Sequence, residues 1–243
     1  MKTQIVGILN LSHDSFSGDF VEDSKSKLLE LIRDGADIID IGAQSTRPNY
    51  KEISIQEEID RLKILPDLVK ISSVPISIDT YRSEVAEFAF ESGAKILNDI
   101  RGLRDSKMID IAKKFDRVIA MHDGSLSTMK DRFRAILNSG IDRSKIILDP
   151  GIGFGKSAEE DLKTIANLDE LRTIDGKKFP MLLACSRKSF IGKTLGLDVA
   201  NRVEATGAAC VIAILAGVEF LRVHDVQAIS RMAKMTDAIL NSR

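Results

Sequence analysis

Residues 75–99, PISIDTYRSEVAEFAFESGAKILND, carry the pattern that decides the fold. Pro75–Ile78 is a short β-like run that ends at Asp79, Arg82–Ser92 is an amphipathic stretch, and Lys95–Leu97 is a second β-like run. The second run ends at Asn98, and both runs are apolar, as expected of parallel strands that are covered on both sides. The segment therefore predicts a β-α-β unit with a polar residue at the end of each strand.

The same unit recurs in both directions from this segment. The predicted strands are Gln4–Leu9, Ile38–Ile41, Pro75–Ile78, Lys95–Leu97, Arg117–Met121, Lys145–Leu148, Met181–Ala184 and Phe220–Val223. The helical stretches between or after them include Ser24–Asp34, Ile55–Ile71, Arg82–Ser92, Ala158–Leu171 and Val226–Leu240. Eight units of roughly 30 residues predict an α/β fold, a single-domain (β/α)8 TIM barrel over residues 1–243.

A doubly wound open sheet is the alternative architecture. Such a sheet usually has fewer strands and a glycine-rich phosphate turn after the first strand. Here the first strand is followed by Asn10-Leu11-Ser12-His13, which does not form such a turn. The barrel is therefore favoured.

Composition restricts the possible partners and location. The chain has 243 residues, with 35 Lys and Arg against 36 Asp and Glu, so no overall basic field attracts nucleic acid or an anionic membrane. The longest apolar run, Ala205–Leu221, is interrupted and short of a membrane span. The N-terminus has no secretory pattern, and Cys185 and Cys210 form no CxxC pair. These features predict a soluble cytoplasmic protein.

Polar side chains follow every predicted strand. They are Asn10, Gln44–Pro48, Asp79-Thr80, Asn98-Asp99, His122-Asp123, Asp149–Gly151, Ser186–Ser189 and Arg222–Asp225. Any one of them can be a helix N-cap, but Asn98, Lys188, Arg222 and His224 are poor caps or none. Because all eight strand ends of a barrel meet on one face, we expect a polar pocket there.

Asp149–Lys156, DPGIGFGK, is a glycine-rich segment after the sixth strand. A Walker A motif needs four residues between its first glycine and its Gly-Lys pair, and this segment has too few. Three glycines in five residues still allow a tight turn or a close approach of backbone to ligand. A plain flexible loop is the alternative.

Taken together, the motifs resemble dihydropteroate synthases. The resemblance rests on GILNLSHDSFS at 7–17, STRP at 45–48, SIDT at 77–80, NDI at 98–100, DPGIGFGK at 149–156, MLLACSRKSFI at 181–191 and RVHD at 222–225. It runs from the first strand to the last. It implies a folate-pathway transferase that joins 6-hydroxymethyl-7,8-dihydropterin pyrophosphate to p-aminobenzoate, giving 7,8-dihydropteroate and pyrophosphate.

The resemblance also implies roles for individual residues. Asp79, Asn98, Asp149 and Lys188 would hold the pterin, since a carboxylate can accept the paired N–H donors of such a ring. Arg222 and His224 would bind the pyrophosphate, with Asn10 near a Mg²⁺ ion that the pyrophosphate carries. Phe16, Thr46, Arg47, Pro48 and Ser189 would form the p-aminobenzoate pocket. Asp79, Asp149, Lys188, Arg222 and His224 would carry the catalysis.

Dimerisation is a further expectation. The helix before the eighth strand, with Ala205, Ala208, Ala209, Val211, Ile212 and Leu215, is too apolar to face water on any side. Members of the family pair through this region, so a homodimer is expected. Arg187, by contrast, is expected to pair structurally near the site.

The first loop departs from the family pattern, with His13 in place of a proline and Gly18-Asp19-Phe20 in place of Asp-Gly-Gly. The segment after the fifth strand, 122–141, is shorter than in most members. Two alternatives stay open. A corrinoid-dependent methyltransferase would share the ring anchors but has no use for the SRKS and RVHD motifs. A pterin-binding relative without synthase activity would fit the altered loop, although Asn10, Lys188, Arg222 and His224 are retained.

Overall fold

Eight parallel strands form a barrel in the computed structural model, which describes residues 2–11, 18–44 and 52–242. The strands are β1 (Gln4–Asn10), β2 (Ile38–Gly42), β3 (Ile76–Asp79), β4 (Ile96–Asp99), β5 (Arg117–Met121), β6 (Ile146–Asp149), β9 (Leu182–Leu183) and β10 (Phe220–Val223). They lie in the order β6-β5-β4-β3-β2-β1-β10-β9, and a parallel bridge between Leu148 and Met181 brings β6 to β9. The predicted (β/α)8 architecture is confirmed.

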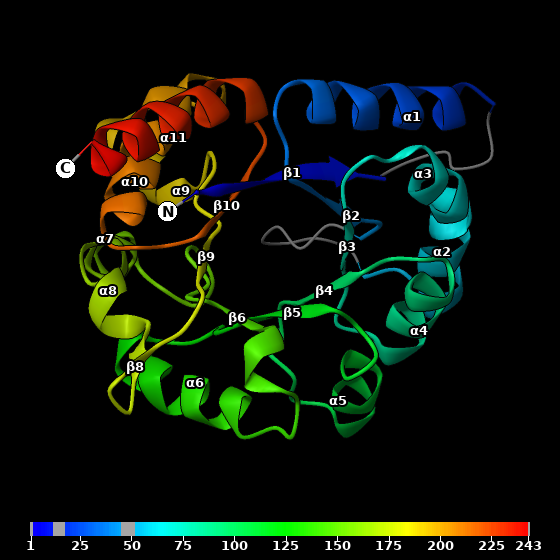
Figure 1. The fold of residues 1–243 in the computed structure, drawn as a ribbon, viewed down its shortest axis with the longest axis horizontal. Helices are drawn as coiled ribbons and strands as arrows, with labels where there is room; N and C mark the ends of the chain where they lie inside the picture. The colour runs from blue at the N-terminus through cyan, green and yellow to red at the C-terminus, as the bar shows by residue number, and fades with distance from the viewer. Residues whose placement is uncertain (1, 12–17, 45–51, 243) are drawn as a thin grey trace.

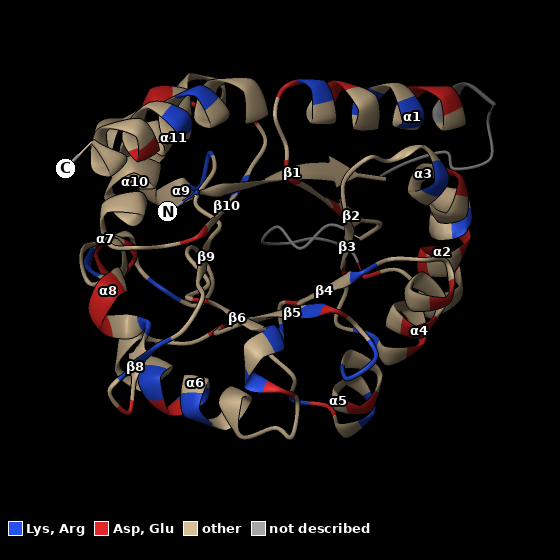
Figure 2. Ribbon diagram, in the orientation of Figure 1, with Lys and Arg blue, Asp and Glu red and all other residues tan. Residues whose placement is uncertain are grey.

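Helices form an outer ring around these strands (Figure 1). They are α1 (Gly18–Arg33), α2 (Ile55–Arg61), α3 (Leu65–Ile71), α4 (Ser83–Glu91), α5 (Ser106–Ala112), α6 (Met129–Leu137), α7 (Ala158–Ala166), α8 (Leu168–Leu171), α9 (Ser189–Leu195), α10 (Val203–Leu215) and α11 (Val226–Asn241). Their charged residues of both signs are spread around the outside of the ring, whereas α10 is almost free of them (Figure 2). No helix in the described part of the chain is long and apolar enough to cross a membrane.

Buried apolar side chains fill the inside of the barrel. This inner cluster consists of Val6, Ile38, Ile96, Ile119, Ile147, Leu182, Ala184 and Phe220. Side chains two residues apart on a strand face the same way. The residues two positions after Ile38, Ile96, Ile147 and Phe220 are polar, and they are Asp40, Asn98, Asp149 and Arg222. The inner cluster is therefore the floor beneath a polar mouth.

Three elements differ from the prediction. The stretch 55–71 is two helices joined by a 3-10 turn, η1 (Leu62–Ile64), because Pro66 near the start of α3 has no N–H to continue the helical ladder. The stretch 158–171 is likewise divided at Asn167. The antiparallel pair β7 (Thr173–Ile174) and β8 (Lys177–Lys178), which precedes β9, was not predicted.

Candidate active site

Four neighbouring strands end at one level of the barrel mouth, and three of them carry a polar residue there. In the parallel register, Asn10 pairs with Gly42, Gly42 with Asp79, and Asp79 with Asn98. A Cβ added at Gly42 would lie 3.7 Å from Asn10 Oδ1 and 3.8 Å from Asp79 Oδ2. Glycine at this position therefore leaves the space between Asn10 and Asp79 open.

Arg222 links two carboxylates in the mouth. Its Nε donates to Asp40 Oδ2 at 2.6 Å, and its Nη2 donates to Asp79 Oδ2 at 2.7 Å. Asp40 Oδ2 also accepts a hydrogen bond of 3.0 Å from Asn98 Nδ2. One hydrogen-bonded network thus joins side chains from β2, β3, β4 and β10. The contacts of Arg222 in this network are to carboxylates, and none of them tests a contact with phosphate. The pyrophosphate role of Arg222 therefore stays a prediction.

Three oxygens of this network have no hydrogen-bond partner among the described residues. They are Asp40 Oδ1, Asp79 Oδ1 and Asn98 Oδ1, and all three are buried. A buried polar atom without a partner is costly, so such atoms usually have a ligand or water to satisfy them. Here all three are acceptors, which indicates a ligand that presents N–H groups.

Asp149 and Lys188 lie on the other side of the mouth. Asp149 is buried, and its Oδ1 accepts the backbone N–H of Gly151 at 2.7 Å. Lys188 Nζ donates to the carbonyl of Ile152 and lies 4.7 Å from the centre of the Phe154 ring. The glycine-rich segment after β6 therefore carries contacts to both residues, and it is more than a plain flexible loop.

Burial shifts the protonation of these groups toward their neutral forms. It raises the pKa of Asp79 to about 7, against the opposing effect of Arg222, and nearby Asp40, Glu58 and Asp149 raise it further. Burial also raises the pKa of Asp149, although Lys188 opposes this shift, and it lowers the pKa of Lys188 to about 8. The site therefore contains an acid and a base that titrate near neutral pH.

His224 and its neighbours occupy the edge of the mouth after β10. The side chain of His224 is exposed, and its Nδ1 lies 3.2 Å from Ser186 Oγ. Arg187 forms a two-pronged ion pair with Asp225, with Nε donating to Oδ2 at 2.8 Å. This is the structural pairing expected of Arg187, and it fixes the loop after β9 beside the segment that follows β10.

The p-aminobenzoate residues are described only in part. Ser189 is exposed at the first position of α9. Phe16, Thr46, Arg47 and Pro48 lie outside the described residues, as does His13 of the altered first loop. Their predicted roles stay predictions.

Comparison with known proteins identifies the family to which this chain is similar. The family described as pterin binding enzyme matches residues 6–132 and 126–224. A dihydropteroate synthase of Bacillus subtilis is 42% identical over 258 residues, covering 99% of this chain and 90% of the relative. The chain belongs to the dihydropteroate synthase family. It is accordingly a transferase of folate biosynthesis.

Solved structures of dihydropteroate synthases share the whole fold. The enzyme of Clostridium difficile, solved in the presence of pteroic acid, has a TM-score of 0.92 at 38% identity and covers 98% of this chain and 97% of its own. The enzyme of Xanthomonas albilineans, solved with 4-aminobenzoic acid, has a TM-score of 0.89 at 32% identity, with 98% and 93% covered. The resemblance inferred from the sequence motifs is confirmed.

Asp40 is the part of this dihydropteroate synthase fold that the sequence motifs missed. It lies in the middle of β2, two residues before the strand ends at Gly42, and is fully buried. A signal was present, since a lone carboxylate within Ile38-Ile39-Asp40-Ile41 breaks an otherwise apolar strand. Ser186 lies within the SRKS motif, but no role was predicted for it. Its contact with His224 forms only because β9 and β10 are neighbours in the barrel.

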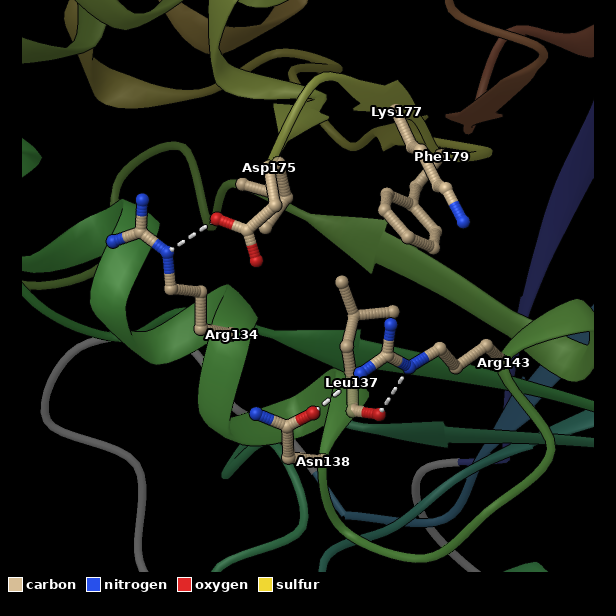
Figure 3. A pocket seen from close by; sticks show the side chains of 8 residues that line it. Arg134, Leu137, Asn138, Arg143, Asp175, Lys177 and Phe179 are labelled. Carbon is tan, nitrogen blue, oxygen red and sulfur yellow. Dashed lines mark hydrogen bonds and ion pairs between the residues drawn. The ribbon is translucent and has the colours of Figure 1, made fainter.

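A second hollow lies at the opposite end of the barrel. It has a volume of about 250 Å³ and lies between the end of α6 and the β7–β8 hairpin (Figure 3). Two of its three cations already have partners, because Arg134 Nε donates to Asp175 and Arg143 Nε donates to the carbonyl of Leu137. The segments that line it lead into the amino ends of β6 and β9, so it is separate from the mouth where the strand ends meet.

Proposed function

We propose that this chain catalyses the alkyl transfer that joins a pterin pyrophosphate to p-aminobenzoate. The nitrogen of p-aminobenzoate forms a bond to the methylene carbon at C6 of 6-hydroxymethyl-7,8-dihydropterin pyrophosphate. The bond from that carbon to the pyrophosphate oxygen breaks, its electron pair leaves with pyrophosphate, and the amine releases one proton. Family membership supports this reaction, as do the pteroic acid and 4-aminobenzoic acid of the two similar structures.

The observation that carries the pterin assignment is a pair of buried acceptors at the ends of β3 and β4. Asp79 Oδ1 and Asn98 Oδ1 are buried, and neither accepts a hydrogen bond from the part of the chain that the structure describes. A pterin carries adjacent N–H donors, and a carboxylate accepts them in charge-assisted hydrogen bonds. Asp149 and Lys188 would hold the remaining polar edge, and the buried apolar floor would exclude water from the ring.

Leaving-group stabilisation would come from the β10 side of the mouth. His224 is exposed there, and Arg222 has a guanidinium suited to phosphate oxygens. Preorganised positive charge at the departing oxygen favours a dissociative route, in which the electron-rich pterin stabilises the cationic methylene carbon. The attacking amine needs little base catalysis, so positioning supplies much of the rest.

The family resemblance implies a magnesium ion, and the residues present fit one carried by the substrate. No group of three or more His, Cys, Asp or Glu side chains in the described part of the chain could hold a metal on its own. Magnesium commonly binds through substrate phosphates and few protein ligands, and Asn10 at the rim offers one such oxygen. Bound with pyrophosphate, Mg²⁺ would neutralise charge on the leaving group.

A homodimer is supported by the distribution of exposed apolar side chains. Six of the ten large exposed ones in the described residues lie between 195 and 239, and these are Leu195, Val199, Ile212, Leu215, Met235 and Ile239. The expectation that α10 faces no water is not met within one chain, since Ile212 and Leu215 are about half exposed. A second copy that covers α10 and α11 would bury them.

A cytoplasmic location is also proposed. Cys185 and Cys210, the two cysteines of the chain, are free thiols whose sulfur atoms lie 3.9 Å apart. Neighbouring cysteines in the thiol form suit a reducing compartment. The net charge of -1 supports small-molecule substrates rather than nucleic acid.

Pyrophosphate release tests the reaction directly. Purified protein with Mg²⁺, 6-hydroxymethyl-7,8-dihydropterin pyrophosphate and p-aminobenzoate is expected to release pyrophosphate only when p-aminobenzoate is present. Omission of Mg²⁺ is expected to suppress the release. Tight pterin binding without release would contradict the synthase activity, and absence of both would contradict the site assignment.

A further inference from the structure

Asp40 has no place in the roles proposed so far, although it lies at the centre of the mouth network. Its side chain is 0% exposed, and its Oδ2 accepts hydrogen bonds from Arg222 Nε at 2.6 Å and Asn98 Nδ2 at 3.0 Å. We propose that Asp40 is a positioning residue that sets the hydrogen-bond polarity of the pterin pocket by orienting the Asn98 amide. This inference rests on the proposed pterin-binding function.

The argument begins with the two ends of the Asn98 amide. One end, Nδ2, can only donate, and the other, Oδ1, can only accept. Asp40 Oδ2 accepts from both Arg222 Nε and Asn98 Nδ2, so Asp40 draws Nδ2 toward the barrel floor. Oδ1 then faces elsewhere and has no partner among the described residues. Asp40 thereby makes Asn98 present an acceptor instead of a donor.

The neighbouring strand presents a second acceptor at the same level. Asp79 pairs in register with Asn98, and its Oδ1 is also without a partner in the described structure. Its Oδ2 is occupied by Arg222 Nη2 at 2.7 Å. Because Asp40 holds the Nε of the same guanidinium, Arg222 is fixed in a position that engages one Asp79 oxygen and leaves the other available.

The result is a pocket edge with two adjacent acceptors and a fixed orientation. Such an edge binds a ring with N–H or amino groups and rejects a ring with oxygen at the same position. When a ligand oxygen faces one of these protein oxygens, neither buried atom can form a hydrogen bond. Sites with such acceptors therefore distinguish strongly between ligands with an N–H group and ligands with an oxygen at that position. Specificity for an amino-substituted pterin would then depend on a residue that does not touch it.

A comparison of two ligands separates this role from a merely structural one. The dissociation constants of 6-hydroxymethylpterin and of 6-hydroxymethyllumazine, in which oxygen replaces the 2-amino group, would be measured by calorimetry for each protein. We expect the native protein to prefer the pterin by about 100-fold or more. In Asp40→Asn, Asn98 is free to turn its Nδ2 toward the ligand, and the preference is expected to fall at least about tenfold.

Asp99→Asn is the matched control. Asp99 is the next residue of β4 and is 1% exposed. Among the described residues, its carboxylate accepts hydrogen bonds from the backbone N–H groups of Arg101 at 2.8 Å and Leu103 at 2.7 Å, and from no side chain. The Asp99→Asn substitution removes a buried carboxylate without changing a partner of the Asn98 amide. The ligand preference of this variant should therefore match that of the native protein. An Asp40→Asn preference within twofold of the native value would overturn the proposal.

A measurement on the native protein covers the case in which Asp40→Asn does not fold. The side-chain NH2 signals of Asn98, assigned by their loss in Asn98→Ala, are expected to include one proton that exchanges slowly with solvent. Fast exchange of both protons would overturn the proposal. Turnover of the native protein is measured separately. Absence of pyrophosphate release would contradict the proposed function, whereas a ligand preference that is unchanged in Asp40→Asn would contradict the role of Asp40.

Discussion

The mouth of the barrel balances three carboxylates against two cations at the scale of single residues. Asp40 and Asp79 both accept hydrogen bonds from the Arg222 guanidinium. Burial lowers the pKa of Arg222, but the two carboxylates outweigh this effect and raise it. Asp149 and Lys188 influence each other electrostatically, and each opposes the effect of burial on the pKa of the other. Asp79 and Lys188 are the groups whose protonation changes near neutral pH.

Pterin binding should therefore have a narrow pH optimum. The pKa of Asp79 is raised to about 7, so below that pH the side chain is protonated and no longer a full acceptor. The pKa of Lys188 is lowered to about 8, so above that pH the side chain loses its charge. We expect the affinity to rise as the pH increases through about 7 and to fall above about 8. Calorimetric titration of 6-hydroxymethylpterin between pH 5.5 and 9 would measure this.

Asp79→Asn is the control for the lower limb of that profile. Without the titrating carboxyl, the rise in affinity through pH 7 should disappear, while the fall assigned to Lys188 remains. A lower limb that persists in Asp79→Asn would assign the titration to another group. Asp149, whose pKa burial also raises, would be the next candidate.

Asp149→Asn tests the pterin anchor by turnover. Loss of the carboxylate removes its charge-assisted hydrogen bonds to the ring, and we expect kcat/KM to fall roughly 100-fold, the equivalent of about 3 kcal/mol. Asp110→Asn, a change of an exposed carboxylate on α5, should leave kcat/KM unchanged. Full turnover in Asp149→Asn would show that the anchor role is wrong.

At the scale of single elements, the turn after β6 depends on one glycine. Gly151 has a φ of +63°, and a Cβ added there would lie 2.0 Å from the carbonyl oxygen of His122. Its N–H also holds Asp149 Oδ1. We expect Gly151→Ala to lower the free energy of unfolding by about 3 kcal/mol, from left-handed strain plus the clash.

Gly140→Ala isolates the backbone strain from the clash. Gly140 has a φ of +87° and no heavy atom within 4 Å of an added Cβ, so a loss of about 1 kcal/mol is expected. Both variants would be measured by urea denaturation. Equal losses would mean that the contact with His122 contributes nothing.

The amino ends of β9 and β10 are joined by Arg172. Its Nε donates to the carbonyl of Phe179 at 3.1 Å, and its other nitrogens donate to the Gly217 carbonyl and to Glu219. Glu219 in turn accepts the N–H of Met181 at 2.9 Å. Because Arg172 is buried and its removal would leave Glu219 and two carbonyl groups without this donor, we expect Arg172→Ala to lower the free energy of unfolding by about 3 kcal/mol in thermal or urea denaturation.

Arg134→Ala is the exposed counterpart. Arg134 pairs with Asp131 and Asp175 at the surface, so its removal should have no measurable effect on unfolding. Similar losses in the two variants would mean that burial does not determine the contribution of Arg172. In that case, strand pairing without a contribution from Arg172 would hold the barrel closed between β9 and β10.

At the scale of the whole molecule, the exposed apolar side chains of α10 and α11 predict self-association. We expect Leu215→Glu to shift the protein from dimer to monomer in sedimentation velocity, because it places a charge on a side chain that is 56% exposed in one chain. Leu29→Glu on α1, where the side chain is 50% exposed, should leave the dimer intact. A native protein that sediments as a monomer would contradict the prediction.

The eight strands, the barrel, the family resemblance and the residues at the strand ends were all predictable from the amino-acid sequence. They were predictable because a parallel strand buried on both sides is a short apolar run, and a polar residue interrupts that run where the strand ends. Asp79, Asn98 and Asp149 were located at strand ends in this way, whereas the functional roles of the site residues stay predictions. Helix breaks at Pro66 and Asn167 were missed because the apolar period continues across them.

The contacts among these groups, by contrast, could be established only from the folded chain. Arg222 and Asp40 are 182 residues apart in sequence, and Asp40 and Asn98 are 58 apart, yet they share one oxygen. No local pattern encodes such contacts, because they depend on strand register and on which face each side chain takes in the closed barrel. The same closure buries Asp79 and so sets its pKa, a property that the sequence of a strand end does not carry.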